Sequence, residues 1–168
     1  MYGWSKLYCE NLIQTFARQQ GLEYVILRLG HVYGEGEEKY RKVMPVMIES
    51  AINGNDITIY GDGEELRTFI YIDDVAKAIV NSIRLTTSKI INIVGNEAVS
   101  INALAKMILR IADADVKVNH IDSDTMNRYL TFDNSKLMNT LLDGVTQLEE
   151  GLCKEIDYMK DKMCEHSI

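Results

Sequence analysis

Hydrophobic positions along the chain follow two periods, one typical of helices and one typical of strands. Helical spacing covers residues 4–20, 43–53, 73–84, 100–111, 135–142 and 147–163. Shorter runs typical of strands cover residues 24–29, 57–60, 66–72, 90–94 and 116–121. Because helices and strands alternate throughout, the pattern predicts an α/β fold with several crossover connections.

Polar residues and glycines mark the ends of these predicted elements. Gly21 ends the first helical run. Asp73 and Ser100 each precede a helical run, and a short polar side chain at that position accepts hydrogen bonds from the free backbone amides. We therefore expect Asp73, with its neighbour Asp74, to have a structural role as an N-cap.

The segment from residue 30 to residue 42 is predicted to be a polar loop. Three glycines, Gly30, Gly34 and Gly36, lie near its start. Glycine allows the backbone to approach another group closely, and loops carry function more often than core elements do. This loop is therefore a candidate for part of a binding site.

Composition places the chain among folded proteins with one core. Its 168 residues are 46% hydrophobic and carry a net charge of −7. This hydrophobic fraction is too high for a disordered chain, and no basic block offers the positive face that nucleic acid or an anionic membrane needs. The chain also shows neither an apolar run of membrane-spanning length nor a signal peptide. We therefore expect no nucleic-acid or membrane partner and a cytoplasmic location.

The cysteines and histidines do not form a recognised metal or disulfide pattern. The three cysteines show no CxxC spacing and the three histidines no HxxxH spacing; they are Cys9, Cys153, Cys164, His31, His120 and His166. We expect reduced thiols and no metal site.

Tyr2 and Lys6 form a Tyr-x-x-x-Lys pair, which places a phenol and an ammonium one helical turn apart on one face. A neighbouring cation favours the phenolate, so such a pair can act as a general acid and base closer to neutral pH. The spacing alone is a weak signal, because Tyr158 and Lys162 repeat it in the last predicted helix. We interpret that second pair as surface decoration.

The Tyr2/Lys6 pair belongs to the first of several sequence blocks that occur in a fixed order. They are Tyr2-Gly3-Trp4-Ser5-Lys6, residues 27–34 (LRLGHVYG), residues 57–63 (ITIYGDG), residues 67–76 (RTFIYIDDVA), residues 91–95 (INIVG) and residues 133–136 (DNSK). Together they resemble the extended short-chain dehydrogenase/reductase family of nucleotide-sugar epimerases and dehydratases. The resemblance covers nearly the whole chain.

The resemblance implies roles for individual residues. Tyr2 would exchange a proton with a sugar hydroxyl while hydride passes to or from the nicotinamide. Lys6 would hold the nicotinamide ribose and lower the pKa of Tyr2. Arg67 would contact the diphosphate of a nucleotide sugar, for which a forked cation is well suited. Residues 57–60, with Ile59 among them, would line the pocket for the nucleobase.

Three positions depart from the family pattern. His31 occupies the place of an asparagine that touches substrate, and Thr68 replaces an aspartate. Ser123 lies roughly where relatives carry a second diphosphate-binding arginine, and Arg128 is the candidate that compensates for it. We therefore include His31 and Arg128 among the candidate substrate-binding residues.

The glycine signature GxxGxxG of the family's dinucleotide site does not occur in these 168 residues, where no glycine triplet follows a strand and opens a helix. The predicted fold is α/β, a C-terminal substrate-binding lobe plus the last helix and strand elements of an incomplete Rossmann-like lobe. We assign residues 1–34 to the dinucleotide lobe and residues 35–168 mainly to the substrate lobe. The complete enzyme would use NAD or NADP, and we expect this chain alone to bind neither.

The leading hypothesis is thus the C-terminal portion of an NAD(P)-dependent nucleotide-sugar epimerase or dehydratase, inactive by itself. The alternative is a non-catalytic nucleotide-sugar binding module, or a partner subunit that lacks the cofactor site. Under either hypothesis the ligand is a nucleoside diphosphate sugar. We also expect a homo-oligomer formed through the apolar helix at residues 4–20 and the strand at residues 24–29.

Overall fold

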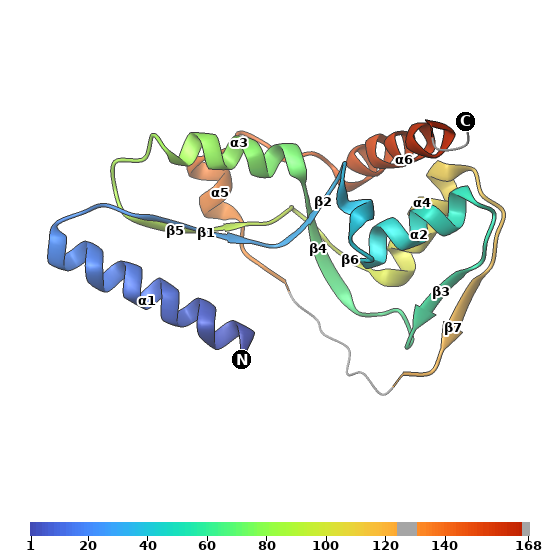
Figure 1. Ribbon diagram of the computed structural model, residues 1–168, viewed down its shortest axis with the longest axis horizontal. Coiled ribbons are helices and arrows are strands. Elements are labelled where there is room, and N and C mark those ends of the chain that lie inside the picture. Colours follow the sequence, from blue (N-terminus) through green and yellow to red (C-terminus); the bar gives the residue numbers. More distant parts are fainter. Residues whose placement is uncertain (124–130, 166–168) are drawn as a thin grey trace.

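The computed structural model describes residues 1–123 and 131–165 and confirms the α/β class (Figure 1). The helices are α1 (Tyr2–Gln20), α2 (Val43–Ile52), α3 (Ile72–Ser82), α4 (Ile101–Ala112), α5 (Ser135–Thr140) and α6 (Leu148–Glu165), with a short 3-10 helix η1 (Glu37–Lys39). The strands are β1 (Val25–Leu29), β2 (His31–Tyr33), β3 (Ile57–Tyr60), β4 (Leu66–Tyr71), β5 (Lys89–Ile93), β6 (Ala98–Ser100) and β7 (Val118–Ile121).

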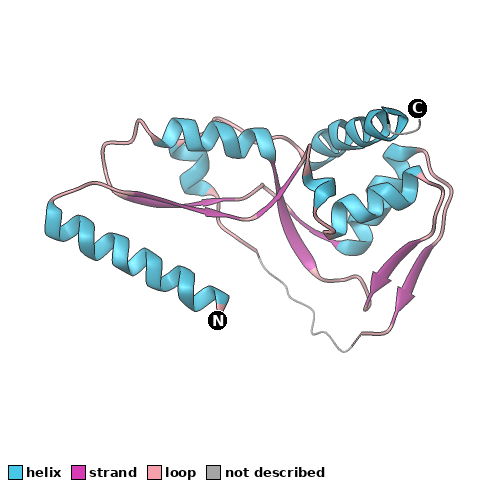
Figure 2. Cartoon of the chain, in the orientation of Figure 1, coloured by secondary structure: helices cyan, strands magenta, loops and turns pink. Residues whose placement is uncertain are grey.

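The first sheet pairs β1 with β5 in parallel, with Val25 opposite Lys89 and Leu29 opposite Ile93. In Figure 2, α1 lies along one side of this sheet, and α3 and α5 lie on the other. A hydrophobic cluster fills the space between the sheet and α3 and α5, and it includes Ile91 and Leu137, which have no exposed surface. Parallel strands need a crossover connection, which the intervening helices provide.

A second sheet, of three strands, crosses the middle of the molecule. Its central strand β4 pairs in parallel with β2 and antiparallel with β6. Four of the six residues of β4 are buried, because helices or strands lie on both of its faces. This sheet joins the α1 half of the chain to the half that contains α2, α4 and α6 (Figure 1).

The third sheet, β3 with β7, packs beside helices α2, α4 and α6. Ile57 and Ile59 point into a core that these helices share, whereas Thr58 and Tyr60 point outward. Ser100 caps α4 as predicted, because its Oγ accepts a hydrogen bond from the Ala103 amide at 3.1 Å. The buried face of α4 has the helical spacing that the sequence showed.

Three short elements lie where the sequence predicted none. The segment 30–42 is not only a loop, because it contains β2 and η1, and β6 precedes α4. Strands of three residues are too short to show alternation, and β2 is fixed by its pairing with β4 rather than by local preference. The predicted loop was therefore wrong in part.

Asp73 is not the N-cap of α3, and this prediction was wrong. The helix begins at Ile72, Tyr71 occupies the cap position, and Asp73 lies in the first turn, where a negative charge favours the helix dipole. Asp74 is 3% exposed, and its carboxylate accepts a hydrogen bond from the Thr146 amide at 2.6 Å. Asp74 therefore has a structural role, but it ties α3 to the segment before α6.

Helix α1 exposes most of its apolar side chains. Ala17 is its one buried residue, and the exposed fractions of its apolar stripe run from 44% to 56%, at Leu7, Leu12, Ile13 and Phe16. Within the described residues, β1 pairs with β5 alone, so its other edge is open. An open strand edge beside an apolar helix is a surface that another polypeptide can cover.

We expect this chain to self-associate through α1, and Leu12→Glu to shift it toward the monomer. Leu12 is 55% exposed in the single chain and would be covered on association. A glutamate at this position would therefore bury a charge without a partner, which opposes the association. Light scattering over a dilution series measures the mass. Gln19→Glu, at an exposed polar position of the same helix, adds the same charge and should leave the mass unchanged. A wild-type chain that stays monomeric at high concentration contradicts the expectation.

Candidate active site

The pairing of β2 with β4 places two candidate residues on one face. His31 lies in register with Phe69, and Arg67 precedes Phe69 by two positions on β4. Because successive side chains of a strand alternate, His31, Phe69 and Arg67 face the same side. The ring centroids of His31 and Phe69 are 5.8 Å apart. Residues 36 positions apart in the sequence thus meet.

The charge at this face comes from two cations rather than from the histidine. Burial lowers the pKa of His31, and the positive charges of Arg67 and Lys42 lower it further. A hydrogen bond with the Thr68 backbone and the charge of Glu65 act in the opposite direction but are outweighed. His31 is therefore neutral at pH 7, whereas Arg67 and Lys42 are positive. Such a group can hold an anion with more than one charged oxygen.

Arg67 is oriented by a single carboxylate. Its Nε and Nη2 atoms donate to Glu65 Oε1 at 3.3 and 3.2 Å, and both side chains are about 30% exposed. Glu64 does not share this role, because its carboxylate accepts a hydrogen bond from Asn102 Nδ2 at 2.7 Å. A guanidinium has five N–H donors, so Arg67 keeps donors for an anion.

Lys42 is a candidate that the sequence reasoning missed. It stands at the N-cap of α2, and its Nζ atom lies 2.9 Å from Glu37 Oε1 in the segment after β2. In the sequence, the one indication of a role for Lys42 is its position between the glycine-containing segment and an apolar helix. No local pattern connects Lys42 with His31. The pairing of β2 with β4 brings it near the face that carries His31 and Arg67.

Tyr2 and Lys6 lie on the first turns of α1, as the spacing predicted. The Lys6 Nζ atom lies 5.2 Å from the centre of the Tyr2 ring, and 77% of Tyr2 is exposed. The N-terminal end of α1 is directed back toward the middle of the molecule (Figure 1). Among the described residues, no hydrogen bond or ion pair joins Tyr2 or Lys6 to His31 or Arg67.

The remaining candidates lie differently. Ile59 is 3% exposed and belongs to the core, so its side chain does not face solvent, whereas its neighbour Tyr60 does. Thr68 is also buried. Arg128 lies outside the described residues.

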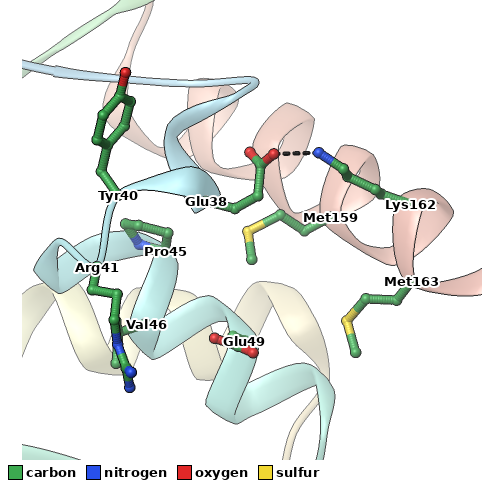
Figure 3. Close-up of a pocket in the computed structure, with 9 residues that line it drawn as sticks. All are labelled: Glu38, Tyr40, Arg41, Pro45, Val46, Glu49, Met159, Lys162 and Met163. Atoms are coloured by element: carbon green, nitrogen blue, oxygen red, sulfur yellow. Dashed lines mark hydrogen bonds and ion pairs between the residues drawn. The ribbon is translucent and has the colours of Figure 1, made fainter. Parts of the chain in front are cut away.

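A cavity of about 230 Å³ lies between α6 and the segment that contains η1 and the start of α2 (Figure 3). Its lining has an apolar part and a charged part and contains none of the candidate residues; it consists of Glu38, Tyr40, Arg41, Pro45, Val46, Glu49, Met159, Lys162 and Met163. The interpretation of Tyr158 and Lys162 as surface decoration was wrong, because Lys162 is partly buried and bonds to both Glu38 and the Tyr158 hydroxyl.

Other kinds of site find no support in the part of the chain that the structure describes. Residues 1–123 and 131–165 hold no group of three or more potential metal ligands. The three cysteines are free and exposed. None of the described helices is both long and apolar enough to cross a membrane.

The fold and these motifs define the chain as an extended short-chain dehydrogenase/reductase of the nucleotide-sugar type. The NAD dependent epimerase/dehydratase family model matches residues 1–94, which is more than half of the chain. The chain therefore belongs to the NAD-dependent epimerase/dehydratase family.

Individual relatives agree with this assignment. The UDP-N-acetyl-alpha-D-glucosaminuronate decarboxylase of Bacillus cytotoxicus is 31% identical over 172 aligned residues, which cover 94% of this chain and 54% of that protein. A UDP-glucose 4-epimerase from Thermotoga maritima, solved with UDP-glucose, superposes with a TM-score of 0.88 at 28% identity. A UDP-glucuronic acid 4-epimerase from Bacillus cereus, solved with UDP-glucuronic acid and NAD, gives 0.82 at 29% identity.

The matches span only part of those proteins. The two structures are covered to 54% and 52% of their length, although 96% of this chain is aligned in each case. The chain thus spans about half the length of these relatives.

Proposed function

We propose that this chain binds the nucleoside diphosphate sugar of an NAD- or NADP-dependent epimerase or dehydratase and supplies its Tyr–Lys acid-base pair. The observation that carries the proposal is that His31 and Arg67 share the face made by β2 and β4, with the positive charge of Lys42 acting on His31 from the N-cap of α2. Two cations and one neutral imidazole can together neutralise and hydrogen-bond a diphosphate. Relatives solved with UDP-glucose and UDP-glucuronic acid support this ligand class.

In this proposal the two parts of the chain have different tasks. Residues 1–34 bring the last helix and strand of a dinucleotide lobe, and residues 35–168 form mainly the substrate lobe. Ile59 would contribute to the nucleobase pocket through its backbone, because its side chain is buried. Arg128 stays a candidate for the second diphosphate contact.

Tyr2 would exchange a proton with a sugar hydroxyl at its phenol oxygen. Lys6, one helical turn away, would stabilise the phenolate and donate hydrogen bonds to ribose hydroxyls. NAD or NADP, when bound, would supply hydride-transfer chemistry at a sugar carbon. Tyr2 and Lys6 are both exposed, which leaves them accessible to the ribose end of such a cofactor. In residues 1–123 and 131–165, however, no glycine-rich turn joins a strand to an α-helix, so the described part has no cradle for the pyrophosphate.

Titration calorimetry with UDP-glucose, UDP and UMP tests the substrate site. We expect UDP and UDP-glucose to bind and UMP to bind at least tenfold more weakly, because UMP lacks the second phosphate that Arg67 and Lys42 would contact. Equal affinity for UDP and UMP, or no binding of either diphosphate, would contradict the proposal. Binding of UDP-glucose without turnover after addition of NAD is expected under both hypotheses, because the 168 residues are expected to be inactive by themselves.

We expect the 168 residues by themselves to bind NAD only weakly, with a dissociation constant on the order of 1 mM or above, since Lys6 offers contacts to ribose and not to the pyrophosphate. Calorimetry with NAD measures this affinity. A dissociation constant of a few micromolar contradicts the expectation and would mean that these residues already form a complete cofactor site.

A further inference from the structure

A carboxyl group lies buried without a partner on the inner face of α6. Glu155 is 1% exposed. Both of its carboxyl oxygens, and Oε2 of Glu37, are buried and lack a hydrogen-bond partner among the described residues. A buried carboxylate without a partner is costly, so such groups are found paired or protonated. None of the roles described above uses Glu155.

Every element that packs against this part of α6 contributes a titratable group. The segment after β2 brings Glu37 and Glu38, and the N-cap of α2 brings Lys42, all three of which act on Glu155. The further groups are Tyr33 of β2, Tyr71 of β4, Glu49 of α2, Arg110 of α4 and, on α6 itself, Tyr158 and Lys162. The Tyr33 hydroxyl donates its hydrogen to the Leu148 carbonyl oxygen at 3.4 Å, so this hydrogen is not donated to Glu155.

The charges around Glu155 do not balance unless one carboxyl is protonated. Glu37 is paired with Lys42, and Glu38 is paired with Lys162. On α4, Arg110 is paired with Glu149 at 2.8 Å. Three carboxyl groups thus share two ammonium groups, and Glu155 is the one without an ion pair.

Electrostatics assigns the proton to Glu155. Burial raises its pKa to about 8, and the negative charges of Glu37 and Glu38 raise it as well, against a lowering by Lys42. Burial also raises the pKa of Glu37, but its bond to Lys42 works against that change. Glu155 is therefore the group that keeps its proton at neutral pH, whereas the ion pair with Lys42 favours the carboxylate form of Glu37.

We propose that Glu155 is a positioning residue, whose proton holds the segment 34–42 against α6 and thereby fixes Lys42 beside His31 and Arg67. A protonated Glu155 can donate its hydrogen to the free Oε2 of Glu37, whose Oε1 already accepts from Lys42. The chain Glu155–Glu37–Lys42 would then carry no net charge. When Glu155 loses its proton, the buried carboxylates of Glu155 and Glu37 share the single ammonium of Lys42. Because the two carboxylates then repel each other, the segment 34–42 separates from α6. The consequence for diphosphate binding rests on the function proposed above.

The direction of the pH dependence follows from the raised pKa of Glu155. The docked state holds a proton that the released state, with an ordinary pKa of 4.5, gives up. The contribution of the Glu155 proton to docking is therefore complete below pH 4.5 and is lost as the pH rises through 8. Lys42 then leaves its place beside His31 at alkaline pH.

Carbon-13 NMR of the glutamate carboxyl groups of the full chain, between pH 5 and pH 10, tests the protonation. We expect one carboxyl resonance with a midpoint near pH 8, absent from Glu155→Gln. This measurement needs no ligand and no function. A Glu155 resonance that titrates below pH 6 overturns the proposal.

Hydrogen exchange of residues 34–42, corrected for the intrinsic pH dependence of exchange, tests the positioning. Between pH 7 and pH 9.5, protection should fall tenfold or more in the wild type. Glu155→Gln, which keeps a neutral hydrogen-bond donor, should retain its protection, and Asp157→Asn, an exposed carboxyl on the same helix, should behave as the wild type. Equal loss of protection in the wild type and in Glu155→Gln overturns the proposal.

UDP titrations of the same variants test whether the protonation of Glu155 affects ligand binding at the candidate site. UDP affinity should fall about tenfold from pH 7 to pH 9.5 in the wild type and stay level in Glu155→Gln. If no variant binds UDP at any pH, the proposed function fails, whereas the NMR and exchange results still decide the role of Glu155.

Discussion

Gly95→Ala is expected to destabilise the chain by about 3 kcal/mol, the upper part of the usual range for overpacking a core. A Cβ atom at Gly95 would lie 2.0 Å from the carbonyl oxygen of Phe69, which belongs to the backbone of β4 and cannot rotate away. Because Phe69 is in register with His31, the shift of β4 should also disturb the candidate site. Urea unfolding followed by circular dichroism measures the change.

Gly144→Ala is the matched control for this substitution. No atom lies within 4 Å of the added Cβ, and neither glycine has a positive φ, so the same chemical change meets open space. We expect a change within about 0.5 kcal/mol. A similar result at Gly95 would show that β4 does not approach the segment after β5 as closely as the structure places it.

Arg67→Ala is expected to weaken binding of UDP-glucose by roughly 1.5–3 kcal/mol, the range for hydrogen bonds to charged groups. The loss corresponds to about a tenfold to 150-fold rise in the dissociation constant. Removal of the guanidinium leaves Lys42 as the cation beside His31 and frees Glu65, whose negative charge would then repel the diphosphate. Calorimetry at pH 7 measures the affinity.

Arg110→Ala serves as the control for Arg67→Ala. Arg110 is also an arginine paired with a glutamate, but it lies on α4 with a side chain that is 62% exposed. Its removal should leave UDP-glucose affinity within twofold of the wild type. Equal effects of the two substitutions would return Arg67 to the role of a surface ion pair with Glu65.

The sequence by itself determined the elements whose burial shows as a period. The stripe of α4, the Ser100 cap and the strand at residues 57–60 were predicted correctly, because each depends on neighbours within one turn or one strand. The ordered motifs also determined the family, since blocks from Tyr2 to Lys136 occur together in it. Tyr2 and Lys6 share a helical face for the same local reason.

Tertiary structure alone decided which of these residues meet. Strand β2 has three residues and exists through its pairing with β4, which brings His31 to the face that carries Arg67, while the charge of Lys42 acts on His31 from the N-cap of α2. Tyr71 occupies the cap position of α3, and Asp74 accepts a hydrogen bond from the amide of Thr146, 72 positions away. In the sequence, Glu155 is one of several charged residues on an amphipathic helix. The packing of η1 and β2 against α6 buries it near two other carboxyl groups. Pairing and burial between distant segments depend on the whole chain, and so no local pattern records them.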